Sequence, residues 1–292
     1  MNILLTGASG FLGSHFPIEK NIITLGMKPT NNIQCDLSKN IPVDLFDINK
    51  VVHMAGIAHI NPQNKDDKKK FHEINYIGTQ NLIKSLDGHN INQFIYISSV
   101  AVYGLNSGEL INENHSLKPF TAYGKSKLET EKYLINWAAK KNINLLILRL
   151  PLVIGNNPPG NLGRMIDSIK KGRYVAIKNN RAKKSVVLAS DVVNICLSSG
   201  NMSGIYNLSV SKNPTFEELE NFIAKKFNTK IFFKIPSTII KYICIFGDML
   251  PQSFPIKTSL YDKIVNPLTF DNKKAVSELG WSPSNIFKSD WI

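Results

Sequence analysis

The sequence predicts an α/β fold, in which a doubly wound parallel sheet is followed by a smaller C-terminal lobe. The length of 292 residues suits a core domain with a smaller appendage. Up to about Leu150, short apolar runs alternate with helical stretches, as strands and crossover helices of a parallel sheet do. The runs are nearly continuous, which is typical of strands buried on both faces. They are Ile3–Leu5, Ile22–Leu25, Val51–Met54, Phe94–Ile97 and Leu145–Leu148.

The helices and the domain boundary follow from the same pattern. Phe71–Leu86 and Ala122–Lys140 have the character of helices between strands. The stretch Gly155–Gly163 is rich in Gly, Pro and Asn and marks a boundary. We therefore expect a first domain over residues 1–155, to whose sheet residues 185–208 return as two strands. Residues 156–292 would mainly form the smaller lobe.

Composition and charge exclude several classes of protein. The formal net charge is +13, but the lysines are scattered, with one short run at Lys68–Lys70. Compositional bias and anionic small-molecule ligands are therefore favoured over nucleic acid. The three cysteines are far apart and suit a cytoplasmic protein with reduced thiols. We expect no metal site, no secretory signal and no apolar run of the roughly 18–20 residues that span a membrane.

A glycine-rich turn, Thr6–Gly13 (TGASGFLG), follows the first strand. Its spacing differs from G-x-G-x-x-G, but such a turn lets backbone N–H groups approach a pyrophosphate at a helix N-terminus. Three glycines can also form a simple turn. Their place between a strand and an expected helix favours a Rossmann-like dinucleotide site. The residues expected to bind the cofactor here are Gly7, Ser9, Gly10, Phe11, Leu12 and Gly13.

The end of the second strand indicates which nicotinamide cofactor is bound. Gly26 stands where an acidic side chain would hold the ribose 2′-hydroxyl of NAD. Lys28 follows it and is a candidate partner for a 2′-phosphate. We therefore expect NADP in preference to NAD; the alternative is that Lys28 is a solvated loop lysine.

A serine, a tyrosine and a lysine have the arrangement of a catalytic set. Ser98 and Ser99 end a strand at the sheet edge where α/β proteins bind ligands, and a serine there can hydrogen-bond a substrate oxygen. Tyr123 and Lys127 are four residues apart and share one face of a helix. An ammonium group beside a phenol lowers the phenol pKa from about 10, which prepares it for acid–base catalysis.

Together, the glycine turn and this Ser/Tyr/Lys set resemble the extended short-chain dehydrogenases, the NAD-dependent epimerase/dehydratase family that acts on nucleotide sugars. The resemblance covers nearly the whole chain, up to the segment Asp271–Pro283. It implies Ser99, Tyr123 and Lys127 as catalytic residues. Further cofactor contacts implied by the resemblance are Asp36, Leu37, Met54, Ala55, Gly56, Asn75, Pro151 and Val153. Implied substrate contacts are Ser98, Ser99, Tyr103, Asn161, Leu162 and Lys184.

Two departures from the family pattern direct the functional expectation. Lys184 stands where many relatives have an arginine that grips the nucleotide diphosphate, and Leu152 where UDP-galactose 4-epimerases have a sugar-binding asparagine. The stretch from Pro151 to Asp191 is more similar to reductases of 4-keto-6-deoxy-N-acetylhexosamines in bacterial surface-polysaccharide synthesis. We therefore expect a 4-keto sugar reductase. The alternative is an NAD-dependent 4-epimerase of a nucleotide-linked or lipid-linked sugar. A non-catalytic dinucleotide sensor is a minor alternative, because Tyr123 and Lys127 are intact.

The resemblance also implies the partners. A UDP-sugar is the expected substrate. A homodimer would form through the helices 71–86 and 123–140, with apolar side chains from Leu128, Leu134, Ile135 and Trp137. The apolar segment Ile235–Leu250 is expected to be a core helix of the lobe, so we expect no membrane contact. Contact with a membrane surface, which would suit a lipid-linked sugar, is the minor alternative.

Overall fold

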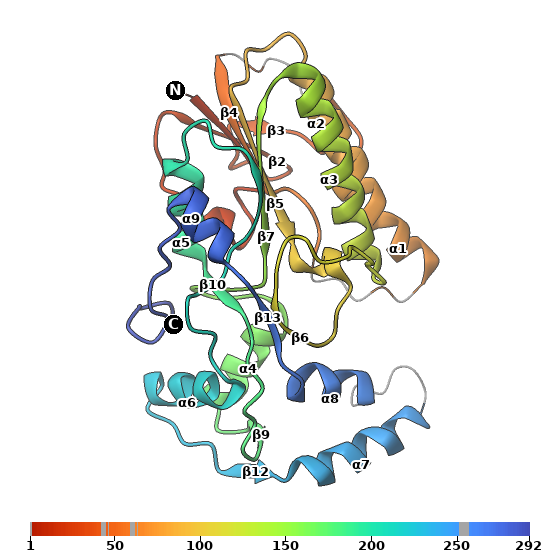
Figure 1. The fold of residues 1–292 in the computed structure, drawn as a ribbon, viewed down its shortest axis with the longest axis vertical. Coiled ribbons are helices and arrows are strands. Elements are labelled where there is room, and N and C mark those ends of the chain that lie inside the picture. Colours follow the sequence, from red (N-terminus) through yellow and green to blue (C-terminus); the bar gives the residue numbers. More distant parts are fainter. Residues whose placement is uncertain (1, 42–44, 46, 59–61, 63, 251–256) are drawn as a thin grey trace.

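The computed structural model describes residues 2–41, 45, 47–58, 62, 64–250 and 257–292. Its centre is a seven-stranded parallel sheet in the order β11-β7-β5-β4-β1-β2-β3 (Figure 1). The expected α/β class with a doubly wound parallel sheet is therefore confirmed. The strands are β1 (Asn2–Thr6), β2 (Ile22–Gly26), β3 (Ile33–Gln34), β4 (Ile48–His53), β5 (Gln93–Ser99), β7 (Asn144–Leu150) and β11 (Gly204–Asn207).

Helices cover both faces of this sheet (Figure 1). On one face, Leu82 and Leu134 join a core with sheet residues such as Leu4 and Phe94. The elements here are α1 (Lys65–Phe71), η2 (His72–Ile77), α2 (Gly78–Ser85) and α3 (Ala122–Lys141). The opposite face is covered by α5 (Ala189–Ser198) and α9 (Lys273–Leu279). The C-terminal helix α9 thus belongs to the larger domain rather than to the lobe.

The crossover between β1 and β2 is much shorter than a helix that could cover a sheet. It contains η1 (Gly13–His15), a single 3-10 turn of three residues, before Phe16 packs into the core. A helix dipole needs several aligned peptides, so this turn contributes little of one. The helix expected after the glycine turn is only this single turn, because Pro17 and the nearby start of β2 leave no room for more.

The lobe at the other end of the molecule has a core of its own, which includes Leu162, Ile166, Leu219 and Ile223. Its elements are α4 (Gly160–Lys170), β9 (Val175–Ile177), α6 (Phe216–Lys226), β12 (Phe233–Ile235), α7 (Ser237–Asp248) and α8 (Thr258–Val265). β9 and β12 form a parallel pair. Between the two cores lie two further parallel pairs, β6 (Gly108–Ile111) with β13 (Leu268–Phe270) and β8 (Leu152–Ile154) with β10 (Val186–Leu188).

Two expectations about this half of the chain need correction. Of the two strands expected to return to the large sheet, β11 pairs with β7, but β10 pairs with β8 in a separate two-stranded sheet. The expected core helix is also wrong, because most of its apolar side chains are exposed and only Cys244 and Gly247 of α7 are buried. Among the described residues, no helix combines the length and apolar character needed to cross a bilayer.

Candidate active site

Ser99 is held at the carboxyl end of β5 by the short 3-10 helix η3 (Val100–Tyr103) that follows it. Its side chain caps this helix, since Oγ accepts a hydrogen bond of 3.2 Å from the Ala101 N–H. The same side chain lies near the Tyr123 hydroxyl and acts to lower its pKa. Ser99 and Tyr123, which are 24 positions apart in the sequence, therefore meet at the sheet edge where ligands were expected.

The first turn of α3 brings Tyr123 to this place. Thr121 caps the helix by accepting a 3.0 Å hydrogen bond from the Gly124 N–H. Gly124 lies against η3 so closely that a Cβ atom at this position would be 2.5 Å from the Ala101 carbonyl oxygen. Because only glycine permits this approach, the start of α3 can lie directly beside the end of β5.

Lys127 lies one turn further along α3 and is almost completely buried. Its Nζ donates a 2.8 Å hydrogen bond to the Ile97 carbonyl of β5 and lies 4.7 Å from the centre of the Tyr96 ring. Burial lowers the pKa of Lys127 to about 8. Burial also raises the pKa of Tyr123. The Ser99 side chain acts to lower this pKa, but its effect is the smaller of the two. The phenol is thus protonated at neutral pH, and the expected lowering of its pKa by Lys127 is not found.

Asn75 supports the set from η2, which is a π-helical turn between α1 and α2. Its side chain donates to Ser126 Oγ at 2.9 Å and accepts from the Ile57 N–H at 2.8 Å. The wider turn changes the normal helical hydrogen bonding, and the Asn75 carbonyl accepts instead from the hydroxyl of Thr79 at 2.6 Å. Gly56 leaves space for this amide, because a Cβ there would be 2.7 Å from Asn75 Oδ1.

Ser98 and Tyr103 belong to a buried polar network beneath the set. Ser98 Oγ donates to Glu131 Oε1 at 2.5 Å, and Arg149 donates to the same carboxylate through Nε and Nη2 at 3.1 and 2.7 Å. Arg149 Nη1 also donates to the Tyr103 hydroxyl, which in turn donates to Asn207. Ser98 and Tyr103 therefore both hydrogen-bond other side chains of the protein. Their contact with a substrate stays a prediction.

The glycine turn has the features of a pyrophosphate site even though a long helix is missing. Gly7 has φ of 78°, and a Cβ there would lie 2.8 Å from the Ala55 nitrogen, so the turn packs directly on the segment after β4. Within the described residues, no hydrogen bond uses the backbone N–H groups of Ser9, Phe11 and Leu12. Free N–H groups on a tight turn are what an anionic diphosphate requires, so the turn fits a dinucleotide.

A cavity of about 470 Å³ lies at the ends of β2 and β3, where the resemblance implies the adenine. Asp36 lines it, and hydrogen bonds from Ser38 lower the pKa of the Asp36 carboxyl. Leu37 is buried behind it. Lys28, the expected 2′-phosphate partner, is exposed and is not among the lining residues, which are Met27, Ile33, Gln34, Cys35, Asp36, Asn40 and Ile41. Pro151 and Val153, the expected nicotinamide neighbours, are half-buried at β8.

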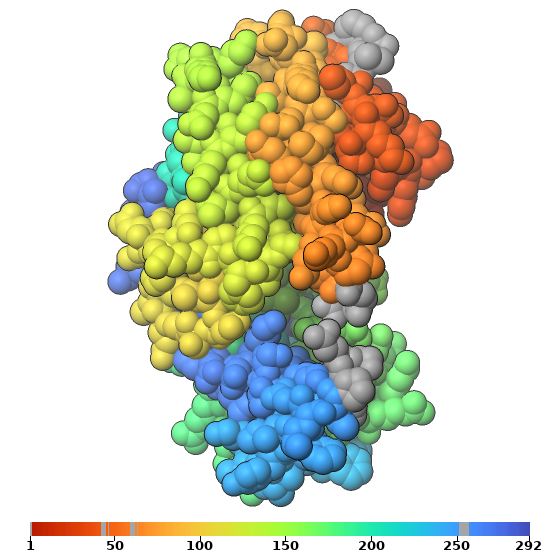
Figure 2. Space-filling view, turned by 90° about the vertical axis from the view of Figure 1, so that its right-hand side faces the viewer, coloured from red at the N-terminus to blue at the C-terminus, as the bar shows by residue number. Residues whose placement is uncertain are grey.

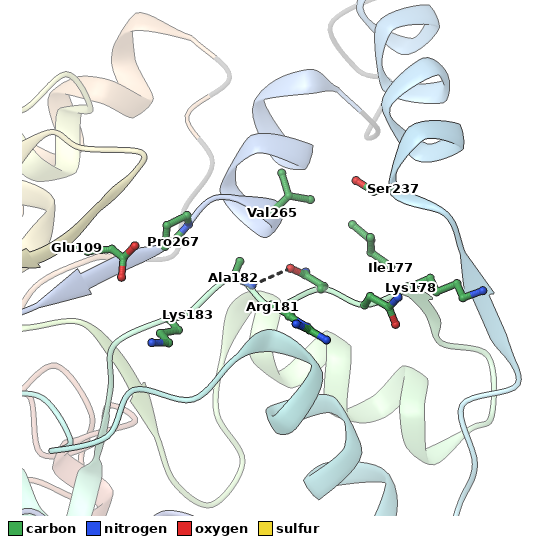
Figure 3. A pocket seen from close by; sticks show the side chains of 11 residues that line it. Glu109, Ile177, Lys178, Arg181, Ala182, Lys183, Ser237, Val265 and Pro267 are labelled. Atoms are coloured by element: carbon green, nitrogen blue, oxygen red, sulfur yellow. Dashed lines mark hydrogen bonds between the residues drawn. The ribbon is translucent and has the colours of Figure 1, made fainter.

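A second cavity, of about 410 Å³, lies in the lobe (Figure 3). Three cations, Lys178, Arg181 and Lys183, line it with one carboxylate, Glu109 of β6. Ser237 from α7 and Val265 from α8 complete this lining. Lys184 is not among the lining residues. Its Nζ donates to the carbonyls of Lys263 and Asn266 at 2.7 and 2.6 Å, and burial lowers its pKa to about 8.

The sequence did not identify the cations of this cavity, because their orientation depends on bridges to distant segments. Lys183 and Lys184 each form a β-bridge, so the segment is extended and successive side chains alternate between its two sides. Arg181 and Lys183 therefore share one side, and Lys184 takes the other. The two substrate contacts expected on α4 face different surroundings. Leu162 is buried in the core of the lobe, whereas Asn161 is exposed and accepts a hydrogen bond from Arg164.

The chain matches a family model over residues 3–208, described as the NAD dependent epimerase/dehydratase family. The protein belongs to this family. The resemblance inferred from the glycine turn and the Ser/Tyr/Lys set is thereby confirmed, as is the assignment to NAD-dependent enzymes.

Two curated relatives carry 4-epimerase names. N-acetyl-α-D-glucosaminyl-diphospho-ditrans,octacis-undecaprenol 4-epimerase of Escherichia coli O157:H7 is 29% identical over 203 residues, which are 66% of this chain and 61% of that protein. UDP-glucose 4-epimerase of Vibrio cholerae is 25% identical over 312 positions, covering 97% of this chain and 90% of that protein. The solved structure of UDP-N-acetylglucosamine 4-epimerase from Bacillus cereus has the same fold, with a TM-score of 0.75 at 24% identity over 98% of this chain and 95% of that one.

Proposed function

We propose that the protein is an NAD-dependent 4-epimerase of a sugar carried on a diphosphate. The observation that carries this proposal is the meeting of Ser99, Tyr123 and Lys127 at the end of β5, beside a glycine turn that fits a dinucleotide. The sequence favoured a 4-keto sugar reductase over a 4-epimerase, and this order is now reversed. The relatives reported above are epimerases by name, whereas the 4-keto reductase gains no specific support.

In this proposal each member of the set has a separate task. A bound nicotinamide supplies the hydride chemistry at C4 of the sugar. Tyr123 transfers the proton at the sugar O4, and Ser99 holds that oxygen through its hydroxyl. Lys127 holds the nicotinamide ribose, and its positive charge favours the phenolate of Tyr123 when the proton has to be taken up from the sugar.

The basic cavity of the lobe would bind the diphosphate of the substrate. Arg181 can donate two parallel hydrogen bonds to phosphate oxygens, and Lys178 and Lys183 add positive charge to the same space. A diphosphate is shared by nucleotide and polyprenol carriers, so this cavity suits either. UDP is the nucleotide in the names of two of the relatives.

We further propose NAD rather than NADP as the cofactor. An epimerase returns the hydride that it removes, so it has no need for a pool of reduced cofactor and can retain one molecule through many turnovers. The exposed Lys28 lies outside the residues lining the adenine-side cavity, which weakens the earlier preference for NADP.

The proposal is tested with the purified protein, without added cofactor. Mass spectrometry of the denatured protein should show retained NAD. Incubation with UDP-N-acetylglucosamine or its polyprenyl-diphosphate counterpart should give a mixture of C4 epimers that reaches the same ratio from either side. Strict dependence on added NADPH, with conversion only of a 4-keto sugar, would instead establish the reductase.

A further inference from the structure

The helix α7 exposes an apolar stripe at the tip of the lobe. Ile239, Tyr242, Ile243 and Phe246 recur at the i, i+3, i+4 and i+7 spacing of one helical face, and all four are exposed. Tyr242 has 74% and Phe246 63% of its surface accessible. A helix of a globular domain normally turns such a stripe towards the core, whereas α7 turns it towards solvent.

A different face of α7, next to the stripe, packs on the protein. Cys244 and Gly247 are buried there, and Lys257, just before α8, donates to the Gly247 carbonyl at 3.0 Å. Asp248 near the end of α7 accepts from both the N–H and the hydroxyl of Thr258. Because these contacts fix how α7 is rotated about its axis, the exposed stripe is part of the fold and is not a consequence of a loosely attached helix.

The stripe belongs to a larger surface that we call the tip patch, formed by the exposed side chains of residues 230–249. Phe232, Phe233 and Met249 extend it on either side of the stripe. Figure 1 shows α7 at the end of the molecule away from the large sheet, and Figure 2 shows this light-blue region as the projecting lower end. Nothing else in the described part of the chain covers these side chains.

Positive charge surrounds the tip patch. The residues 229–250 and 257–266 contain five lysines and only two aspartates. Lys241 lies on α7 itself and is exposed, whereas Lys234 before it forms an ion pair with Glu217 at 3.4 Å. Exposed aromatic and aliphatic side chains accompanied by lysines are the composition of helices that lie in the interface of an anionic membrane.

The tip patch is continuous with the cavity proposed for the diphosphate. Ser237, the first residue of α7, lines this cavity opposite the segment that carries Arg181 and Lys183 (Figure 3). The stripe begins two residues later, at Ile239. A substrate whose sugar and diphosphate occupy the protein would therefore have its carrier leave close to the apolar helix.

We propose that the tip patch docks on an anionic membrane surface, and that the carrier of the sugar is a polyprenyl chain anchored in that membrane. The carrier assignment rests on the 4-epimerase function proposed above, whereas the docking itself does not. It replaces the sequence-based expectation that the protein makes no membrane contact, which depended on α7 being a core helix.

Docking is tested with the full-length protein and sedimented vesicles of phosphatidylcholine containing about 30 mol% phosphatidylglycerol. The wild-type protein should bind these vesicles, and should bind less to pure phosphatidylcholine and at salt well above about 0.1 M. The double variant Tyr242→Asn/Phe246→Asn should bind at least about tenfold more weakly, because two apolar anchors are lost. Lys241→Gln should weaken binding about fivefold.

A matched control is the double variant Ile18→Asn/Val276→Asn, which changes two exposed apolar residues outside the tip patch. It should bind vesicles as the wild type does, and circular dichroism should show that both double variants are folded. Docking is refuted if the wild type does not bind, or if both double variants bind alike. It is also refuted if the tip variant only lowers the mass measured by light scattering, because the patch would then join two copies of the chain.

The carrier is tested by following epimerisation of a vesicle-embedded polyprenyl-diphosphate sugar and of a water-soluble analogue with a short prenyl chain. The tip variant should lose at least about tenfold in rate on the embedded substrate and keep its rate on the soluble one. Conversion of UDP-sugars alone would overturn the polyprenyl carrier. Failure to epimerise any diphosphate-linked sugar would overturn the proposed function, while the vesicle experiment would still decide the docking.

Discussion

Gly124 and Ala101 pack backbone to backbone, so that a methyl group at position 124 would lie 2.5 Å from the Ala101 carbonyl oxygen. This contact sets the distance between the first turn of α3 and η3, and therefore between Tyr123 and the Ser99 side chain that caps η3. The proposed catalytic set thus depends on a residue that has no side chain.

Gly124→Ala should therefore reduce kcat by at least about tenfold, since a displacement of about 1 Å at a catalytic group is sufficient for such a loss. Steady-state kinetics with the epimerase substrate measure this. Gly200→Ala is the control, because a Cβ at Gly200 meets nothing within 4 Å. Equal kcat values for the two variants would show that the close approach at Gly124 does not position Tyr123.

Tyr123→Phe should lower kcat by about 10²- to 10⁴-fold, the usual contribution of a general acid or base. Retention of NAD and the unfolding midpoint should change little, because only one hydroxyl is removed. A variant that keeps more than about a tenth of the wild-type kcat would contradict a proton-transfer role for Tyr123.

The two neighbouring serines should respond in different ways. Ser99→Ala should lower kcat, because the Ser99 side chain lies near the Tyr123 hydroxyl and acts to lower its pKa. Ser98→Ala should mainly lower the free energy of unfolding, by about 1–3 kcal/mol, because Glu131 loses a buried hydrogen bond. Parallel kinetics and urea unfolding measure both effects. A larger kcat loss in Ser98→Ala than in Ser99→Ala would make Ser98 the catalytic serine.

Lys28→Glu tests the cofactor. Because Lys28 lies outside the residues lining the adenine-side cavity, the variant should bind NADH as tightly as the wild type does and NADPH less than about tenfold more weakly. Fluorescence titration with both cofactors measures this. Equal losses for the two cofactors would mean that Lys28 has a structural role, and a wild type that strongly prefers NADPH would favour the reductase.

His53 should make stability depend on pH. It is buried between the hydroxyls of Thr6 and Thr79, and burial lowers its pKa to about 3. An unfolded histidine titrates near 6.5, so below that pH the unfolded chain takes up a proton that the folded chain does not. The stabilisation is complete above pH 6.5 and is lost towards pH 3, at about 1.4 kcal/mol per pH unit. Urea unfolding at pH 7 and pH 5 should show a smaller loss for His53→Gln than for the wild type.

The homodimer expected from the sequence remains a prediction, with a narrower set of contact residues. Leu134 lies in the chain's own core, with Trp137 partly buried against it, and Leu128 packs on a separate cluster around Tyr103. This leaves Ile135 exposed on α3. Light scattering should show a dimer at micromolar concentration, and Ile135→Asp should shift it towards monomer. A wild type that is only monomeric under these conditions would rule out the dimer there.

The parts of the fold and site that the sequence predicted are those governed by local pattern. Continuous apolar runs identified five strands of the large sheet, and the four-residue spacing of Tyr123 and Lys127 placed both on one turn of α3. The end of β5 identified Ser99. These features depend on neighbouring residues, so a single sequence is enough to recognise them.

The features that were missed depend on contacts between distant segments. The π turn at Asn75 is supported by Thr130 of α3, which no local pattern indicates. The alternation that separates Lys183 from Lys184 depends on bridges to Thr215 and Leu268. The apolar composition of α7 gave no sign of whether its stripe turns inwards, because that is decided by packing against α8.

The single turn between β1 and β2 has a consequence for the two ends of the chain. Where a long crossover helix would shelter Ile3, Leu5 and Ile22, the sheet is covered instead by side chains such as Leu279 and Trp281. The C-terminal segment with α9 and Trp281 thus completes the hydrophobic core on which the glycine turn near the N-terminus packs. We therefore expect a protein truncated before α9 to lose the fold of its cofactor half, although the family-matched region 3–208 would be intact.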